Sequence, residues 1–329
     1  MGSLAVHAPD VPDANISPSR TPGADEDGDV LALIRRCGRG ELSRDARAAL
    51  YAVSARLSAQ EWQITPELAR RHGLAPLVFT HLAEASALPL APTDVVAELR
   101  AAYCEALVTN RRLEIELGKV LATFAAHGVE PLLLKGVTLA ARYYPGIALR
   151  PASDIDVLVR REQLAASLRA LRAIGYAPEK GKGRALDFDV LYYLELDYRN
   201  AQGVRVEPHL ELARLPAYRA ALPVAQVWAR TESLTIGGSP ARYLHPWDEL
   251  WYLSLHYGVP HQAHRLIWLV DIAELVRAHT GVSSGARANW DWEGFVGATL
   301  AHGLALPVGV ALQQARDLLG LEPVSYTHL

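Results

Sequence analysis

The sequence predicts an α+β fold in which a small mixed sheet with flanking helices lies between N-terminal and C-terminal helical regions. Short apolar runs bounded by glycine and proline between residues 129 and 212 have the length and spacing of strands. Residues 29–128 and 222–321 instead repeat apolar side chains at the three- and four-residue spacing of helices. With 329 residues, 50% of them hydrophobic, the chain can bury a substantial core.

These patterns divide the chain into five parts. Residues 1–28, rich in Pro, Asp, Ser and Gly, are expected to form a disordered leader. Residues 29–128 form the N-terminal helical region, residues 129–240 the central core, and residues 241–323 the C-terminal helical region. Residues 324–329 resemble the translation of a sequencing-library adapter, so we expect them to be foreign to the protein.

Helix start signals occur several times in the N-terminal region. Asp29, Ser43 and Thr65 are candidate N-caps, with Pro66 at a first helical position, and Ser58 with Glu61 forms a candidate capping box. Residues 93–127 keep apolar side chains at helical spacing over a long stretch that leads into the first strand. The segment 110–112 on this helix is expected to be a solvated face rather than a ligand contact.

The central core begins with a strand, a tight turn and a helix. Residues 129–134 read as a short buried strand, Lys135 and Gly136 as the turn, and residues 137–144 as the helix. Backbone N–H groups exposed at such a turn bind phosphate, and Gly136 lets a ligand approach the backbone closely. Lys135 can add a point charge for a triphosphate.

The next strand, residues 154–159, carries two carboxylates on one face. Asp154 and Asp156 alternate with Ile155, Val157 and Val159, which face the core. Carboxylates this close repel unless a cation lies between them, and Mg2+ bound to phosphate oxygens is the usual solution. An isolated Asp-x-Asp is more often a solvated strand end, but the strand, turn and helix upstream favour a phosphate site.

A helix over residues 161–174, ended by Gly175, is expected behind the sheet, followed by a hairpin of strands 188–198 and 204–212. Alternation places Glu207, His209 and Glu211 on one face of the second strand. Pro208 cannot donate a ladder hydrogen bond, so this strand is expected at an edge or at a bulge.

The C-terminal region, residues 222–321, reads as helical throughout. His256, His261, His264 and Asp271 fall within it, but their spacing matches no zinc pattern, and contacts of this kind between packed helices are commonly structural. Trp251 and Trp268 are expected in the core.

Composition excludes several other classes of protein. The net charge of −3 gives no global basic field for nucleic acid or an anionic membrane, and no apolar run reaches the length of a membrane span. Two widely separated cysteines indicate neither a zinc site nor a disulfide framework, which fits a reducing cytoplasm.

The motifs of the core together resemble a known superfamily, the nucleotidyltransferases with the DNA polymerase β fold. Its signature is a strand, a glycine turn, a helix and a strand with Asp-x-Asp. The motifs are similar to the bacterial branch called uncharacterised nucleotidyltransferase, over about half of the chain, from residue 110 to 271. They are Leu134-Lys135-Gly136, Tyr144-Pro145, Arg150-Pro151 and Ser153-Asp154-Ile155-Asp156-Val157-Leu158-Val159. Val137 departs from the Gly or Ser that commonly follows the first turn glycine.

The resemblance implies transfer of a nucleoside monophosphate from a nucleoside triphosphate, with ATP favoured, to an acceptor, with release of pyrophosphate. Asp154, Asp156 and Glu207 would bind two Mg2+ ions, for which Mn2+ could substitute, with no other metal and no membrane partner. The implied nucleotide-binding residues are Lys135, Gly136, Arg150 and Ser153, and further site candidates are His209, Glu211, His256 and Asp271.

The acceptor stays open among a small molecule, a peptide, a protein and a tRNA end. A catalytically inactive nucleotide-binding or partner-binding protein that retains the fold is the alternative function. Val137 and the uncertain third carboxylate favour that alternative, whereas the intact Asp154 and Asp156 pair favours the enzyme.

Overall fold

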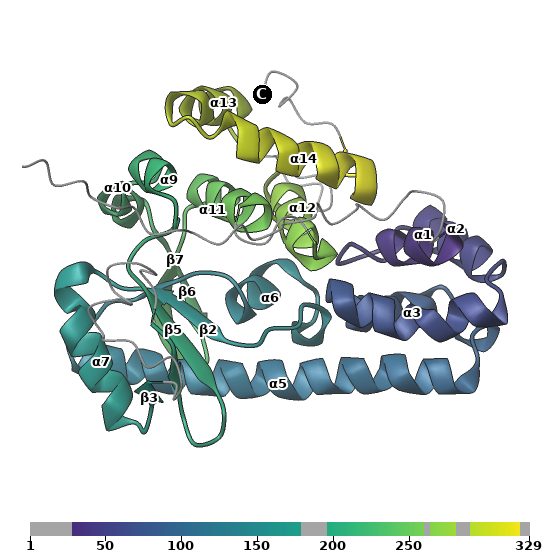
Figure 1. Ribbon diagram of the computed structural model, residues 1–329, viewed down its shortest axis with the longest axis horizontal. Coiled ribbons are helices and arrows are strands. Elements are labelled where there is room, and N and C mark those ends of the chain that lie inside the picture. The colour runs from purple at the N-terminus through teal and green to yellow at the C-terminus, as the bar shows by residue number, and fades with distance from the viewer. Residues whose placement is uncertain (1–27, 179–195, 260–263, 281–289, 323–329) are drawn as a thin grey trace, which may run out of the picture.

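A computed structural model describes residues 28–178, 196–259, 264–280 and 290–322 (Figure 1). Within these ranges, seven strands form one mixed sheet flanked by helices, between an N-terminal and a C-terminal helical region. The predicted α+β architecture is therefore confirmed. The leader up to residue 27, the C-terminal hexapeptide, His261 and most of the predicted strand 188–198 lie outside the described residues.

The N-terminal region consists of helices whose starts follow the predicted caps. Ser43 accepts a hydrogen bond from the backbone N–H of Ala46, and Ser58 and Glu61 form the predicted capping box. The predictions of caps at Asp29 and Thr65 are wrong. Asp29 lies within the first turn of its helix, and the Thr65 hydroxyl donates to the Glu61 carbonyl within a continuous helix. The helices are α1 (Gly28–Arg36), α2 (Arg44–Ser54), α3 (Ala59–His72), α4 (Ala75–Glu84) and α5 (Thr93–Ala126).

The sheet has the strand order β3-β4-β5-β2-β1-β7-β6. The strands β1 (Leu132–Leu133), β2 (Ile155–Leu158) and β5 (Arg205–His209) form its centre, where β1 is antiparallel to β2 and β2 is parallel to β5. The outer strands are β3 (Ala177–Pro178), β4 (Tyr198–Arg199), β6 (Glu232–Ile236) and β7 (Ser239–Tyr243). Helices α6 (Val137–Tyr143) and α7 (Leu164–Ala173) lie where the sequence predicts them.

Two strand predictions are wrong. The strand with Pro208 is interior, between β4 and β2, and the Pro208 carbonyl accepts from the backbone N–H of Leu196. Residues 232–243, expected to be helical, form the hairpin β6–β7. Its turn is Gly237-Gly238, and both residues have positive φ angles of 57° and 77°, which a two-residue hairpin turn requires and glycine adopts without strain.

The remaining helices follow β5 and cover the upper part of the molecule in Figure 1. Short helices α9 (Pro216–Ala221) and α10 (Val224–Ala229) lead to the β6–β7 hairpin. The C-terminal helices are α11 (Pro246–Gly258), α12 (Leu266–Thr280), α13 (Trp292–Ala301) and α14 (Ala305–Leu319). Within the ranges that the structure describes, no helix combines the length and apolar character of a membrane span.

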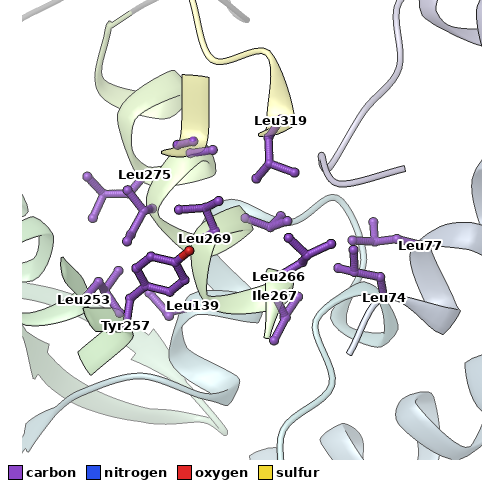
Figure 2. Packing of buried hydrophobic residues seen from close by; sticks show 14 of the residues in the cluster. Leu74, Leu77, Leu139, Leu253, Tyr257, Leu266, Ile267, Leu269, Leu275 and Leu319 are labelled. Atoms are coloured by element: carbon purple, nitrogen blue, oxygen red, sulfur yellow. The ribbon is translucent and has the colours of Figure 1, made fainter. Parts of the chain in front are cut away.

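Apolar side chains cover both faces of the sheet. On one face, Val157 and Val206 pack in a cluster with residues of α5 and α7. On the other, Leu132 and Leu158 belong to a larger cluster that continues through α6, α11, α12 and α14 to the N-terminal helices. Figure 2 shows part of this cluster, including Leu74 before α4, Leu139 of α6 and Leu319 of α14. The helical regions and the sheet therefore share one core.

Helix α5 extends beneath both the N-terminal helices and the sheet (Figure 1). It passes close to the turn of the β6–β7 hairpin, where a Cβ atom added to Gly118 would lie 2.3 Å from the carbonyl oxygen of Gly237. A contact this short requires the backbone to shift. Glycine at position 118 is therefore needed for the close approach of helix and hairpin.

Substitution of Gly118 tests this contact. In an unobstructed helix, Gly→Ala raises stability by roughly 1 kcal/mol through helix propensity. We expect Gly118→Ala to lower stability instead, by about 1–3 kcal/mol, as overpacked positions do. The control is Gly297→Ala in α13, where an added Cβ meets nothing within 4 Å and stability should rise. Urea unfolding monitored by circular dichroism measures both, and equal stabilisation by the two changes would contradict the packing described.

Candidate active site

The pairing of β2 with β5 brings two predicted acidic residues together. In the parallel register Asp156 lies opposite Glu207, and Leu158 lies opposite His209. Side chains opposite each other on parallel strands share a face, so the carboxyl groups of Asp156 and Glu207 point to the same side of the sheet as the imidazole of His209. The predicted alternation of side chains along β5, which places Glu207 and His209 on one face, is therefore observed.

Lys135 and Gly136 approach the same side from the end of β1. Gly136 precedes α6 with φ +70° and ψ −128°, a conformation that L-residues with a side chain rarely adopt. A Cβ atom there would lie 3.3 Å from the Asp154 carbonyl oxygen and 4.0 Å from Oδ2 of Asp156. The turn therefore lies directly against the acidic strand.

Asp156 is buried and holds its charge through two partners. Lys135 Nζ lies 2.6 Å from Oδ2 of Asp156, and His209 Nε2 lies 3.0 Å from Oδ1. Burial alone would raise the pKa of Asp156, but the charge of Lys135 and the hydrogen bond from His209 outweigh it and hold the pKa well below its usual range. The carboxylate is consequently an acceptor, and His209 Nε2 is the donor in their hydrogen bond.

Arg205, which the sequence analysis did not select, connects the remaining carboxyl groups. Its guanidinium forms ion pairs with Asp154 and, at 3.2 Å, with Oε1 of Glu207, and it lies 3.9 Å from Asp197. Ser153 also donates to Asp154, at 3.1 Å. Burial, followed by the charges of Asp156 and Asp154, raises the pKa of Glu207 to about 7.

The structure places only some of the predicted acidic candidates where they could share a cation. Ligand atoms of Asp156, Glu207 and His209 all lie within 4.8 Å of one another. Asp154 immediately precedes β2 and pairs with Arg205. Glu211 lies beyond β5 and is 3.7 Å from Arg161.

Arg150 and Asp271 form a buried ion pair beside this cluster. Arg150 Nη2 lies 2.7 Å from Oδ2 of Asp271, and Tyr144 donates to Oδ1 of Asp271 at 2.7 Å. The side chains of Arg150 and Asp271 are only 6% and 1% exposed. Asp271 thus fixes the loop before β2 to α12, and a role for Arg150 in nucleotide binding remains a prediction.

Asn110 fixes the same loop from the opposite side. Contrary to the expectation of a solvated face, its side chain is fully buried and donates to the carbonyls of Ile147 and Arg150, at 2.5 and 2.7 Å. Its Oδ1 atom accepts from the backbone N–H of Ala152 at 3.0 Å. A polar residue inside a helical pattern gives no sequence signal for such contacts.

A cavity of about 190 Å3 opens next to the cluster. Lys135, Gly136, Arg150, Ser153 and Asp154 line it from the core, and with His256 from the C-terminal helices six of the predicted site residues line one space. The C-terminal helices contribute the other side, and the residues that line the cavity from there are His256, Arg265, Ile267 and Trp268. Trp268, expected in the core, is half-buried, with its ring centroid 5.4 Å from that of His256, whereas Trp251 is fully buried as expected.

A mixed sheet with acidic residues on adjacent strands, next to a lysine-glycine turn, defines a nucleotidyltransferase-like α+β protein. The family model described as "Uncharacterised nucleotidyltransferase" matches residues 58–320, and the chain belongs to this family. Family membership implies a nucleotide substrate. The predicted family is thereby confirmed.

One solved structure shows distant similarity to this chain. An antigenic nucleotidyltransferase-like protein from Paracoccidioides brasiliensis is similar in structure, with a TM-score of 0.40 and 16% sequence identity. The alignment covers 66% of this chain and 98% of that protein. No curated protein matches this chain. A likeness at this level carries no information about the reaction.

The buried pair of Arg150 and Asp271 permits a test by unfolding. Asp271→Ala would leave the Arg150 charge buried without its partner, and we expect a loss of about 3–5 kcal/mol in the free energy of unfolding. Asp271→Asn should lose less, because the amide oxygen still accepts one hydrogen bond. Urea titration measures both variants.

The matched control is the exposed ion pair between Arg56 and Asp29, whose side chains are 57% and 34% exposed. Asp29→Ala should change stability little, since water solvates the remaining charge. If Asp271→Ala and Asp29→Ala had equal effects, the loop before β2 would not depend on the buried pair.

Proposed function

We propose that this protein is an active nucleotidyltransferase that transfers a nucleoside monophosphate from a nucleoside triphosphate to an acceptor, with release of pyrophosphate. The observation that carries the proposal is the register of β2 and β5, which places Asp156 opposite Glu207 beside a cavity lined by Lys135, Gly136 and Ser153. A reaction between a triphosphate and a hydroxyl group needs carboxylates and phosphate-binding groups at one place.

The side chains around the cavity fit the parts of a triphosphate. The Lys135 ammonium is buried against Asp156 and lines the cavity, so it can attract a phosphate oxygen without leaving its partner. The missing side chain of Gly136 lets phosphate approach the backbone. The exposed Ser153 hydroxyl, whose one proton is donated to Asp154, could donate it to a phosphate oxygen instead.

The donor set also fits a divalent cation. The carboxylates of Asp156 and Glu207 lie opposite each other on adjacent strands, Asp154 immediately precedes β2, and two basic side chains, Lys135 and Arg205, already neutralise part of their charge. Buried carboxylates compensated in this way can accept a metal ion in exchange. A bound divalent cation would supply charge stabilisation for the phosphoryl group and for the departing pyrophosphate.

The acceptor is not fixed by the cavity. A small molecule, a peptide, a protein and a tRNA end all remain compatible with a site that lies between the core and the C-terminal helices. ATP remains the favoured nucleotide. The half-buried indole of Trp268 lines the cavity, with the guanidinium carbon of Arg265 5.6 Å from its ring centroid.

A transfer assay tests the proposal. Purified protein, Mg2+ and a cell lysate are incubated with a nucleoside triphosphate labelled at the α-phosphate or, in parallel, at the γ-phosphate. We expect the α-label on the acceptor and the γ-label in pyrophosphate. Asp154→Asn and Asp156→Asn should each reduce transfer by about three orders of magnitude, because each removes a charge that holds the cation.

The control variant is Asp317→Asn, which changes an exposed carboxyl group on α14 that binds Gln313. Circular dichroism confirms that all variants are folded. Transfer that survives Asp156→Asn, or γ-label on the acceptor, would exclude the proposed reaction. Equilibrium dialysis that shows nucleotide binding without turnover would instead favour the catalytically inactive alternative.

A further inference from the structure

We propose that Asp156, Glu207 and His209 form a divalent-cation site in which the imidazole of His209 is a ligand, and that this site selects a first-row transition-metal ion such as Mn2+ over Mg2+. The inference deepens the proposed function and rests on it for the role of the cation. The sequence predicts Asp154 as a metal ligand. Among the described residues, however, the group whose ligand atoms lie close enough to share an ion contains His209 and not Asp154.

The carboxylate oxygens are oriented for such a site. Lys135 holds Oδ2 of Asp156 at 2.6 Å, so Oδ1 faces His209. Arg205 holds Oε1 of Glu207 at 3.2 Å, and Oε2 of Glu207 lies 3.9 Å from His209 Nε2. Each carboxylate thus has one oxygen engaged by a basic side chain and the other directed toward the imidazole.

The distances suit a metal ion in this space. Ligands about 2.1 Å from an ion and at right angles to each other are about 3.0 Å apart. Oδ1 of Asp156 and Nε2 of His209 are 3.0 Å apart in their hydrogen bond, and a metal ion between them would replace the Nε2 proton, which is released to solvent. The 3.9 Å between Nε2 and the Glu207 oxygen is wider, and a small rotation of one side chain would close it.

Charge and donor type determine which ion binds. Lys135 and Arg205 neutralise two of the three carboxylate charges of Asp154, Asp156 and Glu207. Mg2+ relies on oxygen ligands and gives up its waters reluctantly, so a site with reduced negative charge binds it weakly. An imidazole nitrogen adds affinity for transition-metal ions and little for Mg2+.

The test measures metal binding to the full chain without nucleotide or turnover. Electron paramagnetic resonance counts free Mn2+, and pulsed measurements detect a nitrogen atom coordinated to bound Mn2+. We expect Mn2+ to bind at least tenfold more tightly than competing Mg2+, with a coupled nitrogen whose signal changes when histidine is labelled with 15N. His209→Gln keeps a hydrogen-bond donor for Asp156 but removes the ligand nitrogen.

His209→Gln should lose the nitrogen signal and at least tenfold in Mn2+ affinity, while its Mg2+ affinity changes less than threefold. The control is His127→Gln, an exposed histidine at the end of α5, which should leave both affinities and the nitrogen signal unchanged. A nitrogen signal that persists in His209→Gln, or equal affinities of the wild type for Mn2+ and Mg2+, would overturn the proposal. Selective Mn2+ binding without nucleotidyl transfer would reject the proposed function and leave this site intact.

Discussion

The loop between α6 and β2 is the constraint on which the candidate site depends. Asn110 of α5 binds its backbone at three points, and Asp271 of α12 binds the Arg150 side chain. These anchors come from helices on opposite sides of the loop, so they fix where β2 begins. A shift of one residue would turn Asp156 to the other face of the sheet, away from Glu207 and His209.

The acidic cluster is stable because Lys135 and Arg205 place positive charge within it. A carboxylate as buried as that of Asp156 could not remain charged without a partner, and Lys135 and His209 provide one on each oxygen. Lys135 also lines the neighbouring cavity. A phosphate bound there would offer Lys135 a second anionic partner and so ease the entry of a metal ion at Asp156. We therefore expect nucleotide and metal binding to support each other in the proposed reaction.

The sequence predicted those parts of the fold and of the candidate site that depend on a single strand or a single turn. The alternation of Asp154 and Asp156, the turn at Gly136 and the face shared by Glu207 and His209 are local features, and they predicted the central strands and their acidic face. Pairing across the sheet is not local. The interior position of β5 depends on β4 and β2, which is why Pro208 suggested an edge strand incorrectly.

Other elements were missed although a signal existed. Gly237-Gly238 between two alternating segments is a recognised hairpin signal, and Arg205 occupies the same face of β5 as Glu207 and His209 by simple alternation. Asn110 had no such signal, because its partners are backbone carbonyls 37 and 40 residues away. Contacts of this range arise only when the helix and the loop are packed together.

The shared apolar core indicates that the central segment needs the helical regions on both sides to form the candidate site. One apolar cluster includes Leu74 of the N-terminal region, Leu139 of α6 and Leu319 of α14, and the family match spans residues 58–320 rather than the central segment only. A chain cut to residues 129–240 would keep Asp154, Asp156 and Glu207 in sequence but lose both Asn110 and Asp271. Because those two side chains hold the loop that positions β2, the acidic residues need the helical regions on both sides to form a site.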